Sequence, residues 1–209
     1  MRTTRRLSKK TSPAVKLKLY QLKVTLLDAK PPIWRRLVVR GDTTLARLHA
    51  LLQLAMGWYD CHLHTFTIRG KEYSDPNPEW DPPMRDERKV TLTGLKLTAK
   101  SRFRYMYDMG DGWDHEILVE AVTEAETMRP PGAVCLAGAR ACPPEDVGGS
   151  WGYERFLKVI RNPQHQEHAE MLEWVGGGFD PEAFDAKTLN EVLGWKATEF
   201  EKAKNALHA

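Results

Sequence analysis

The sequence predicts an α+β fold: a mainly antiparallel β-sheet with one helix from the N-terminal half packed on it, and a C-terminal layer of short helices. Three observations lead to this class. Segments in which apolar and polar residues alternate follow one another through the first 126 residues. One segment with helical apolar spacing interrupts them. After a long connector rich in proline and glycine, capped helical segments replace them.

A basic tail precedes the first strand. Residues 1–18 carry seven Lys and Arg and no acid, although the whole chain has a net charge of only +3. We predict a disordered tail and a single domain over residues 19–209, with a sheet-rich part (19–126) and a connector and helical part (127–209). Either the tail only solubilises the chain, or it contacts nucleic-acid phosphates. The candidate contacts are Arg2, Arg5, Arg6, Lys9 and Lys10.

The composition is that of an ordinary globular domain. The chain has 209 residues, 42% of them hydrophobic and 28% charged. Three cysteines are too few and too irregularly placed for a disulfide framework, which favours a reducing compartment. There is no apolar run long enough to cross a membrane and no secretory signal, so we expect a cytoplasmic protein without a membrane partner.

The sheet-rich part contains the alternating segments and the one helix. The helix should run over Thr44–Met56, with Leu45, Leu48, Leu52 and Ala55 on its apolar face and Gly57 at its end. A proline-rich loop should cover Ser74–Lys89. The predicted strands are Tyr20–Asp28, Ile33–Gly41, the start of His62–Tyr73, Arg102–Asp108 and Trp113–Val122.

The C-terminal part begins with the connector 128–150, which we predict to be irregular. Helices should follow over Trp151–Arg161, over Pro163–Val175, from Asp185 through Leu193, and over Ala197–His208. Six tryptophans fall at element edges, where we expect core anchors rather than base-stacking surfaces: Trp34, Trp58, Trp113, Trp151, Trp174 and Trp195.

The stretch YDMGDGWDHEI gathers the first group of site candidates. Gly110 and Gly112 should supply the left-handed positions of a hairpin turn, with Asp111 at its tip. Strand alternation then splits the polar groups between two faces. Asp108 and Asp114 flank the turn, where a carboxylate pair could bind a divalent cation, and His115 points inward.

A histidine pair, His62-x-His64, is the second candidate. Two histidines two apart on a strand face the same way and can chelate zinc or another transition metal, but they can equally be buried and hydrogen-bonded. A three-histidine site would form if His115 lay on a neighbouring strand.

Secondary candidates lie in the C-terminal part. His165 and His168 stand three apart on a predicted helix, at the edge of an apolar stripe. Cys142, Glu145 and Asp146 precede a glycine pair at a helix start, although the six-residue spacing from Cys135 to Cys142 does not match a zinc knuckle.

Five long motifs, in order, carry a family resemblance: PIWRRLVV, LHALLQLAMGWYDCHLHTFTI, YMYDMGDGWDHEI, RACPPEDVGGSWGYERFL and NPQHQEHAEMLEWVGGGFDPEAFD. Over about Tyr20–Leu193 the chain resembles the Ri-plasmid ORF-three-like family, also described as insertion-element passenger or TnpR-type proteins. The resemblance implies an α+β domain from plasmids, mobile elements and chromosomes, without an established activity. It also implies site candidates by motif match: His62, His64, Asp108, Asp111, His115, Cys142, Glu145, Asp146, His165 and His168.

Three function hypotheses follow. The absence of a Walker loop, a nucleophile elbow and a dinucleotide fingerprint favours a non-catalytic binding or accessory module with a protein or nucleic-acid partner. The second hypothesis is a metal-dependent hydrolase or nuclease that uses the His/Asp cluster, with zinc as the expected divalent cofactor. The third is nucleic-acid binding through the basic tail.

Overall fold

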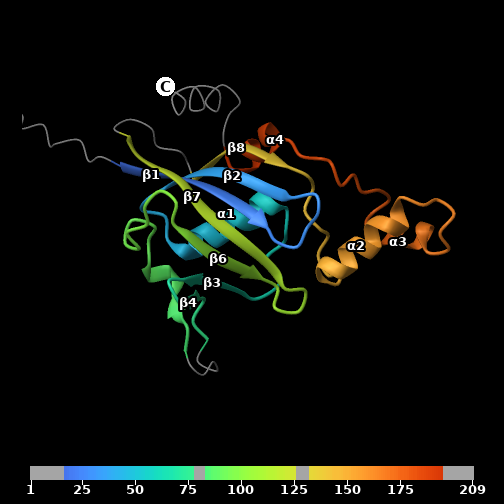
Figure 1. Ribbon diagram of the computed structural model, residues 1–209, viewed down its shortest axis with the longest axis horizontal. Helices are drawn as coiled ribbons and strands as arrows, with labels where there is room; N and C mark the ends of the chain where they lie inside the picture. Colours follow the sequence, from blue (N-terminus) through green and yellow to red (C-terminus); the bar gives the residue numbers. More distant parts are fainter. Residues whose placement is uncertain (1–16, 78–82, 126–131, 195–209) are drawn as a thin grey trace, which may run out of the picture.

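A single eight-stranded sheet carries four α-helices in the computed structural model, which describes residues 17–77, 83–125 and 132–194 (Figure 1). The strand order is β5-β4-β3-β6-β7-β1-β2-β8. The strands are β1 (Leu17–Leu26), β2 (Ile33–Arg40), β3 (His64–Ile68), β4 (Lys71–Ser74), β5 (Arg85–Asp86), β6 (Arg102–Tyr107), β7 (Trp113–Ala125) and β8 (Ala133–Ala139). The helices are α1 (Leu45–Met56), α2 (Gly149–Ile160), α3 (His168–Trp174) and α4 (Ala186–Val192), with a 3₁₀ turn η1 at Glu87–Lys89.

Antiparallel pairing dominates the sheet, and among the described strands only β4 and β5 pair in parallel. This arrangement confirms the predicted fold class. The alternation in β1 has the expected consequence, because Leu22, Val24 and Leu26 are buried on one face while the residues between them are partly exposed. His115, predicted to point inward, is buried on β7 together with Trp113, Ile117 and Val119.

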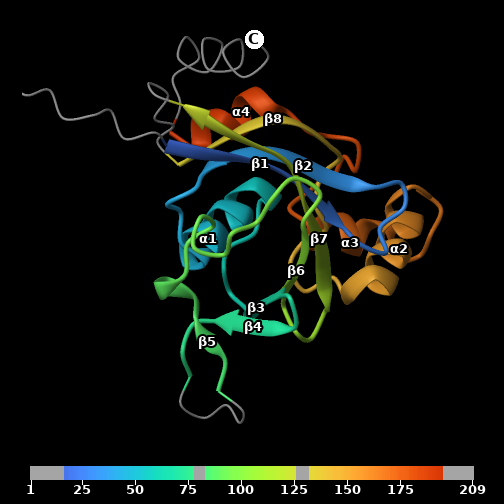
Figure 2. The same cartoon turned by 60° about the vertical axis from the view of Figure 1, so that its left-hand side comes forward.

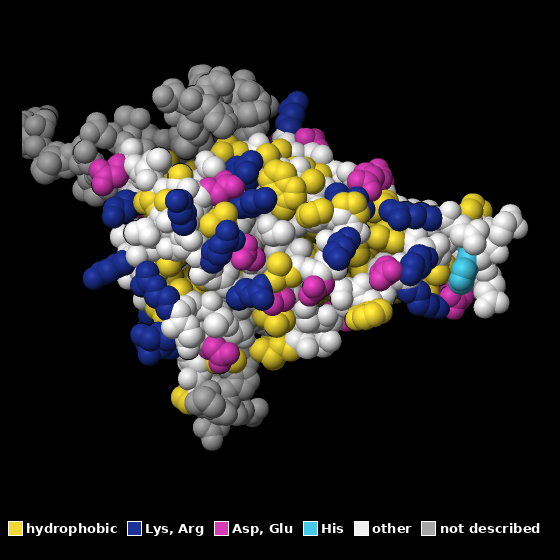
Figure 3. Space-filling model, in the orientation of Figure 1, with side chains coloured by type: hydrophobic (Ala, Val, Ile, Leu, Met, Phe, Trp, Pro, Cys, Tyr) yellow, Lys and Arg dark blue, Asp and Glu magenta, His cyan; other side chains and the backbone are white. Residues whose placement is uncertain are grey.

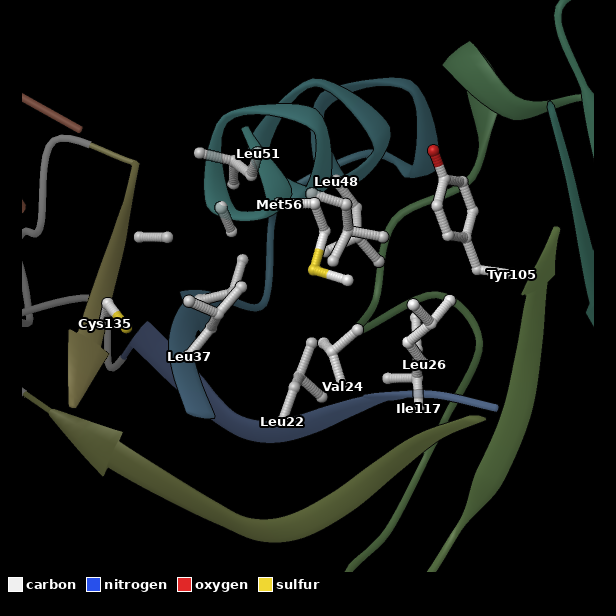
Figure 4. Packing of buried hydrophobic residues seen from close by; sticks show 14 of the residues in the cluster. Leu22, Val24, Leu26, Leu37, Leu48, Leu51, Met56, Tyr105, Ile117 and Cys135 are labelled. Atoms are coloured by element: carbon white, nitrogen blue, oxygen red, sulfur yellow. The ribbon is translucent and has the colours of Figure 1, made fainter. Parts of the chain in front are cut away.

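Helix α1 covers the inner face of the sheet. Leu48 and Met56 lie above Leu22 and Val24 of β1 (Figure 4). The helix starts where the Thr44 side chain accepts a hydrogen bond from the backbone N–H of Arg47. It ends at Gly57, whose φ of 85° is left-handed. All four residues predicted for the apolar face of α1 are buried.

The connector prediction is wrong in its first half, because residues 133–139 form β8 at the edge of the sheet beside β2. Its small residues gave no alternation that would have marked a strand. Asn190 of α4 holds this edge: its side chain accepts from the N–H of Cys135 and donates to the carbonyl of Cys135, both at 2.8 Å. Helix α4 is itself capped by Asp185, as predicted.

Several predicted boundaries need correction. Strand β1 begins at Leu17, so the last two residues of the predicted tail belong to the sheet. The helix predicted from Pro163 begins only at His168, because residues 163–167 form turns. The basic residues Arg2, Arg5, Arg6, Lys9 and Lys10 and the segment Ala197–His208 lie outside the described residues.

Helices α2 and α3 pack on each other at one end of the sheet, whereas α4 lies against β8 (Figures 1 and 2). Basic and acidic side chains are interspersed on the face of the molecule seen in Figure 3. Charges are also paired between strands of the sheet: Arg36 of β2 pairs with Glu120 of β7 across β1, and Arg102 of β6 pairs with Glu116 of the adjacent β7. No helix in the described part of the chain is long and apolar enough to cross a membrane.

Candidate metal centre

The site forms where the chain enters β3 and leaves β6. Asp108 directly follows β6, and its backbone N–H donates to the carbonyl of Leu63 at 2.9 Å. This hydrogen bond extends the β3–β6 pairing by one step. It brings His62, which precedes β3, beside the Asp108 side chain.

The turn after β6 fixes the orientation of Asp108. Its φ of 54° is left-handed, and its Oδ1 accepts from the backbone N–H groups of Gly110 (2.9 Å) and Asp111 (3.2 Å). The left-handed residues of this turn are therefore Asp108 and Gly112, and not Gly110 as predicted. Because Oδ1 is used by the turn, Oδ2 faces His62 at 3.6 Å.

Glu145 comes from the connector before α2. Its Oε1 accepts from the hydroxyl of Tyr107 (3.0 Å) and from the backbone N–H of Tyr59 (2.9 Å). The Pro143 carbonyl accepts from the indole of Trp58 at 3.0 Å, which holds the connector against the end of α1. Glu145 thus resembles Asp108: one of its carboxylate oxygens accepts hydrogen bonds from the protein, and the other lies toward His62.

Four side chains converge as a result, and we call His62, Asp108, Glu145 and Asp146 the His62 site. The Nε2 atom of His62 lies 3.2 Å from Asp146 Oδ1, 3.6 Å from Asp108 Oδ2 and 3.9 Å from Glu145 Oε2. Both His62 Nε2 and Glu145 Oε2 are shielded from solvent, and neither has a hydrogen-bond partner among the described residues. Three carboxylates held around one imidazole repel one another unless a cation lies between them.

The spacing of these atoms fits a metal ion. Ligands bound at ~2.0–2.2 Å in tetrahedral or octahedral geometry are separated by roughly 3.0–3.5 Å. The donor atoms of His62, Asp108 and Asp146 all lie within 4.8 Å of one another. Asp146 is largely exposed, with 74% of its side-chain surface accessible, so an ion could enter from this side.

A second cluster, which we call the His49–His64 pair, also lies near the Tyr107 ring, whose centroid is 6.5 Å from that of His49 and 5.8 Å from that of His62. The two imidazole rings stack with their centroids 3.4 Å apart and their planes within 6°. His49 Nε2 lies 2.7 Å from Asp60 Oδ1, and His64 Nε2 lies 2.8 Å from Glu87 Oε2. His49 Nδ1 is also paired, with the Tyr105 hydroxyl at 2.7 Å.

These contacts distinguish the pair from the His62 site. The Nε2 atom of each histidine already forms a short hydrogen bond with a carboxylate. Moreover, two parallel rings direct their lone pairs in separate planes, so one ion cannot lie in the plane of both. Burial lowers the pKa of His49, and the neighbouring His64 lowers it further against the effect of Asp60. The pair is therefore better suited to hydrogen bonding than to chelation.

A cavity of about 490 Å³ adjoins both clusters. His62 lines it together with the His49–His64 pair, Asp60 and Glu87. The rest of its wall is formed by Leu63, by Ser74 at the end of β4 and by the next three residues, Asp75, Pro76 and Asn77. A molecule in this cavity would meet acid–base groups and the edge of the His62 site together.

His62 and His64, predicted to share one ion, have different partners because only His64 belongs to β3. His115 is fully buried against Tyr105 and Trp58 and belongs to neither cluster. Burial lowers its pKa to about 4. Asp114 is on the opposite face of β7, where its carboxylate lies 3.5 Å from Arg104. Asp111 accepts from the N–H of Gly148 and so links the turn to the start of α2.

The remaining candidates lie elsewhere. Cys142 is buried, and its thiol accepts a hydrogen bond from Arg35 and contacts Met56; burial raises its pKa to about 11. His168 packs with its Nδ1 on the carbonyl of Val159, and His165 Nδ1 lies 3.9 Å from Glu167. His168 therefore belongs to the contact between α2 and α3, whereas His165 contacts Glu167 within the turn that precedes α3.

Sequence reasoning missed His49, Asp60, Glu87, Tyr105 and Tyr107. One signal was available in α1, where His49 and Gln53 stand four residues apart on the buried side of an otherwise apolar helix. Gln53 binds both Tyr105 and Asp60 through its side-chain amide. Such a polar pair inside an apolar helix face indicates a buried hydrogen-bond network.

Comparison with known proteins identifies the family. The model of the plasmid pRiA4b ORF-3-like proteins matches residues 18–188. The chain belongs to this family. An uncharacterised protein of Sinorhizobium fredii (strain NBRC 101917 / NGR234), y4hQ, is 41% identical over 175 residues, which cover 83% of this chain and 89% of that relative.

A solved structure shares the fold of this pRiA4b ORF-3-like protein. It is the crystal structure of MM3350, a protein of unknown function from Methanosarcina mazei Go1, with 36% sequence identity and a TM-score of 0.73. The match covers 82% of this chain and 97% of the other. The first of these two relatives is described as uncharacterised and the second as of unknown function, so they show a family and a fold but no activity.

Proposed function

We propose that this pRiA4b ORF-3-like protein is a binding module for a divalent metal ion, held by His62, Asp108, Glu145 and Asp146. One observation carries the proposal: His62 Nε2 and Glu145 Oε2 are shielded from solvent, accept or donate no hydrogen bond among the described residues, and lie 3.9 Å apart with two further carboxylates beside the same nitrogen. Buried polar atoms are almost always hydrogen-bonded or bound to a ligand. An ion between them would satisfy both atoms and neutralise the carboxylates.

The donor set indicates which ions fit. One imidazole nitrogen and three carboxylate oxygens suit zinc, manganese(II) or iron(II), since imidazole disfavours calcium and magnesium, and soft ions prefer thiolates. The partners of the ligands support this reading. Tyr107 and the Asp108 turn fix one oxygen of each buried carboxylate, as the outer partners of metal ligands commonly do.

Metal content of the untagged protein, purified without added metal, tests the proposal. We expect about one zinc, manganese or iron per chain, and its loss from His62→Ala and from Glu145→Gln. His165→Ala is the matched control, because His165 lies outside the His62 site and should leave the metal content unchanged. A metal-free wild-type protein that also fails to take up these ions on addition would contradict the proposal.

A metal-dependent hydrolase is a second candidate, favoured by the cavity that joins the His62 site to the His49–His64 pair. A metal-bound water gives up its proton more readily than free water, and a neutral imidazole held by a carboxylate can accept that proton. Hydrolysis of chromogenic carboxyl and phosphate esters with and without added manganese distinguishes the candidates. Turnover that disappears in both His62→Ala and His64→Gln would support the hydrolase; metal binding without turnover would support the binding module alone.

A further inference from the structure

A groove between the end of α1 and the end of α3 opens beside the His62 site, and we call it the Trp174 groove. Its volume is about 430 Å³, and its walls come from residues 56–59, from the connector 142–146 and from the end of α3 and the residues after it. Four aromatic side chains line it: Trp58, Tyr59, Trp174 and Phe179. Tyr59 is 81% and Trp174 48% exposed, so much aromatic surface is left in solvent at one place.

Three of these rings are held in place by the protein. The buried Phe156 of α2 contacts Trp174 and Phe179 edge-on, with centroid distances of 5.8 and 5.3 Å. The indole of Trp58 donates to a backbone carbonyl of the connector, and its ring stacks on Tyr107 at 4.9 Å. A ligand would therefore meet aromatic surfaces that are already in position, which lowers the entropic cost of binding.

The charged residues that line the groove are both acids. Glu145 and Asp146 are among the described lining residues, and no lysine, arginine or histidine accompanies them there. Both acids also belong to the His62 site, whose three carboxylates carry a formal charge of −3. A divalent ion at that site would still leave an excess of one negative charge. The groove therefore favours a cationic ligand with or without bound metal.

Side-chain hydrogen-bond acceptors are scarce in the groove, which narrows the class of cation. Glu145 Oε1 already accepts from the Tyr107 hydroxyl and from the N–H of Tyr59, and Glu145 Oε2 is shielded from solvent. Of the two lining carboxylates, only that of Asp146 is largely exposed. A primary ammonium group needs acceptors for three N–H bonds, whereas a quaternary ammonium group needs none and presents methyl groups to the aromatic rings.

We propose that the Trp174 groove binds a small quaternary ammonium compound, with its cationic head against Trp174 and Tyr59 and near Asp146. The negative faces of aromatic rings attract such a cation, and a neighbouring carboxylate adds Coulomb attraction. A volume of about 430 Å³ is ordinary for a small-molecule site. The aromatic rings are not metal ligands, so the cation can bind even if the proposed metal function is wrong.

Calorimetric titration with choline tests the proposal, alongside two comparison compounds of similar size. 3,3-Dimethyl-1-butanol has a carbon atom in place of the quaternary nitrogen, and ethanolamine lacks the methyl groups. We expect each of them to bind about tenfold more weakly than choline. The same order is expected for the protein as purified and for the protein in EDTA, which separates this test from the metal content of the His62 site.

Two variants remove aromatic surface from the groove. Trp174→Ala should weaken choline binding by about tenfold and Tyr59→Ala by about threefold. Tyr59 contacts Glu145 through its backbone N–H, so Tyr59→Ala keeps that hydrogen bond and remains informative if Trp174→Ala unfolds. Trp151→Ala is the matched control. Trp151 is 85% exposed, unlike the core anchor predicted from the sequence, and it lines a different cavity, so choline affinity should not change.

Three results would overturn the proposal. Choline does not bind, or it binds no more tightly than its neutral analogue. Choline binds Tyr59→Ala and a folded Trp174→Ala as tightly as it binds the wild type. A peptide that contains trimethyllysine binds about tenfold more tightly than choline, in which case the ligand is a protein and not a small molecule.

Discussion

Asp108 and Glu145 show how a single carboxylate can have two tasks. Each uses one oxygen to bind backbone or tyrosine donors and directs the other at His62. A carboxylate held this way cannot rotate to relieve the repulsion from its neighbours. An ion at the His62 site would offset this repulsion. Because each carboxylate uses one oxygen for hydrogen bonds within the protein and directs the other at His62, the site differs from an ordinary polar turn.

His115 gives a prediction about pH. Burial lowers the pKa of His115 in the folded protein to about 4, below the ordinary 6.5. Between these two pH values the unfolded chain therefore binds a proton at this residue and the folded chain does not. The stability that its neutral form contributes is complete above pH 6.5 and is lost as the pH falls toward 4. Between pH 7 and pH 5 the loss from this residue should be about 2 kcal/mol.

Urea unfolding of wild type and His115→Asn at the two pH values measures this loss. The asparagine keeps a donor for the Tyr105 carbonyl but cannot take up a proton, so the stability of this variant should depend less on pH. His49, whose pKa is lowered too, leaves a smaller dependence of the same sign. Identical pH dependence in the two proteins would show that His115 titrates normally.

Among the elements, α2 is fitted closely to the connector that carries Glu145 and Asp146. A Cβ atom added at Gly152 would lie 1.9 Å from the carbonyl oxygen of Val147, a distance that the backbone cannot tolerate. The N-terminal turn of α2 therefore needs glycine at this position, although the helical conformation itself does not.

Gly152→Ala should displace the connector and with it two ligands of the His62 site. We expect a loss of about 1–3 kcal/mol in stability and a fall of about 10–100-fold in metal affinity, measured by urea unfolding and by titration with zinc. Gly178→Ala is the matched control, because a Cβ there meets no atom within 4 Å. Unchanged metal affinity in Gly152→Ala would mean that the connector adjusts without moving its carboxylates.

Arg35 ties three elements together from inside the protein. Its guanidinium donates to the carbonyls of Ala55 in α1, Ala139 in β8 and Arg140 just beyond, each within 2.9 Å. Phe184 stacks on it at 4.3 Å. Lysine cannot reproduce this planar fan of donors, so Arg35→Lys should cost about 3 kcal/mol.

Arg36→Lys is the comparison for Arg35, because the neighbouring Arg36 is partly exposed and pairs with Glu120 on the sheet surface. Exposed pairs of this kind contribute about 0.2–1 kcal/mol, so this variant should unfold almost as the wild type does. Equal losses in the two variants, measured by urea unfolding, would show that the buried hydrogen bonds of Arg35 contribute nothing special.

For the whole molecule, the His62 site joins segments that are far apart in sequence: the entry to β3, the exit of β6 and the connector before α2. It therefore exists only in the folded protein, and any ion bound there stabilises folding. At about 100 times the dissociation constant, metal should add about 2.7 kcal/mol and raise the melting temperature by about 5–10 °C. Calorimetry with and without metal should show no such rise in His62→Ala.

The sequence predicts a structural feature well when that feature depends on residues close together in the chain. The strand predicted over Tyr20–Asp28 and the apolar face of α1 both follow from periodicity, and both predictions were correct. Strand β8 was missed because Ala, Cys and Gly carry almost no alternation, and its place is set by β2 and Asn190. His62, Asp108 and Glu145 were each suspected separately. Their meeting depends on the hydrogen bonds of Leu63 and Tyr107, which no local pattern encodes.

The position of β1 has a consequence for synthesis of the protein. β1 and β2 are neighbours in the chain and can pair at once, but the other edge of β1 pairs with β7, where Leu19 meets Thr123. Until β7 has left the ribosome, that edge of β1 offers free N–H and C=O groups to any passing strand. Non-local pairing of this kind slows folding and favours aggregation of the unfinished chain. Chaperones that bind nascent chains should therefore matter most before residue 125 has emerged.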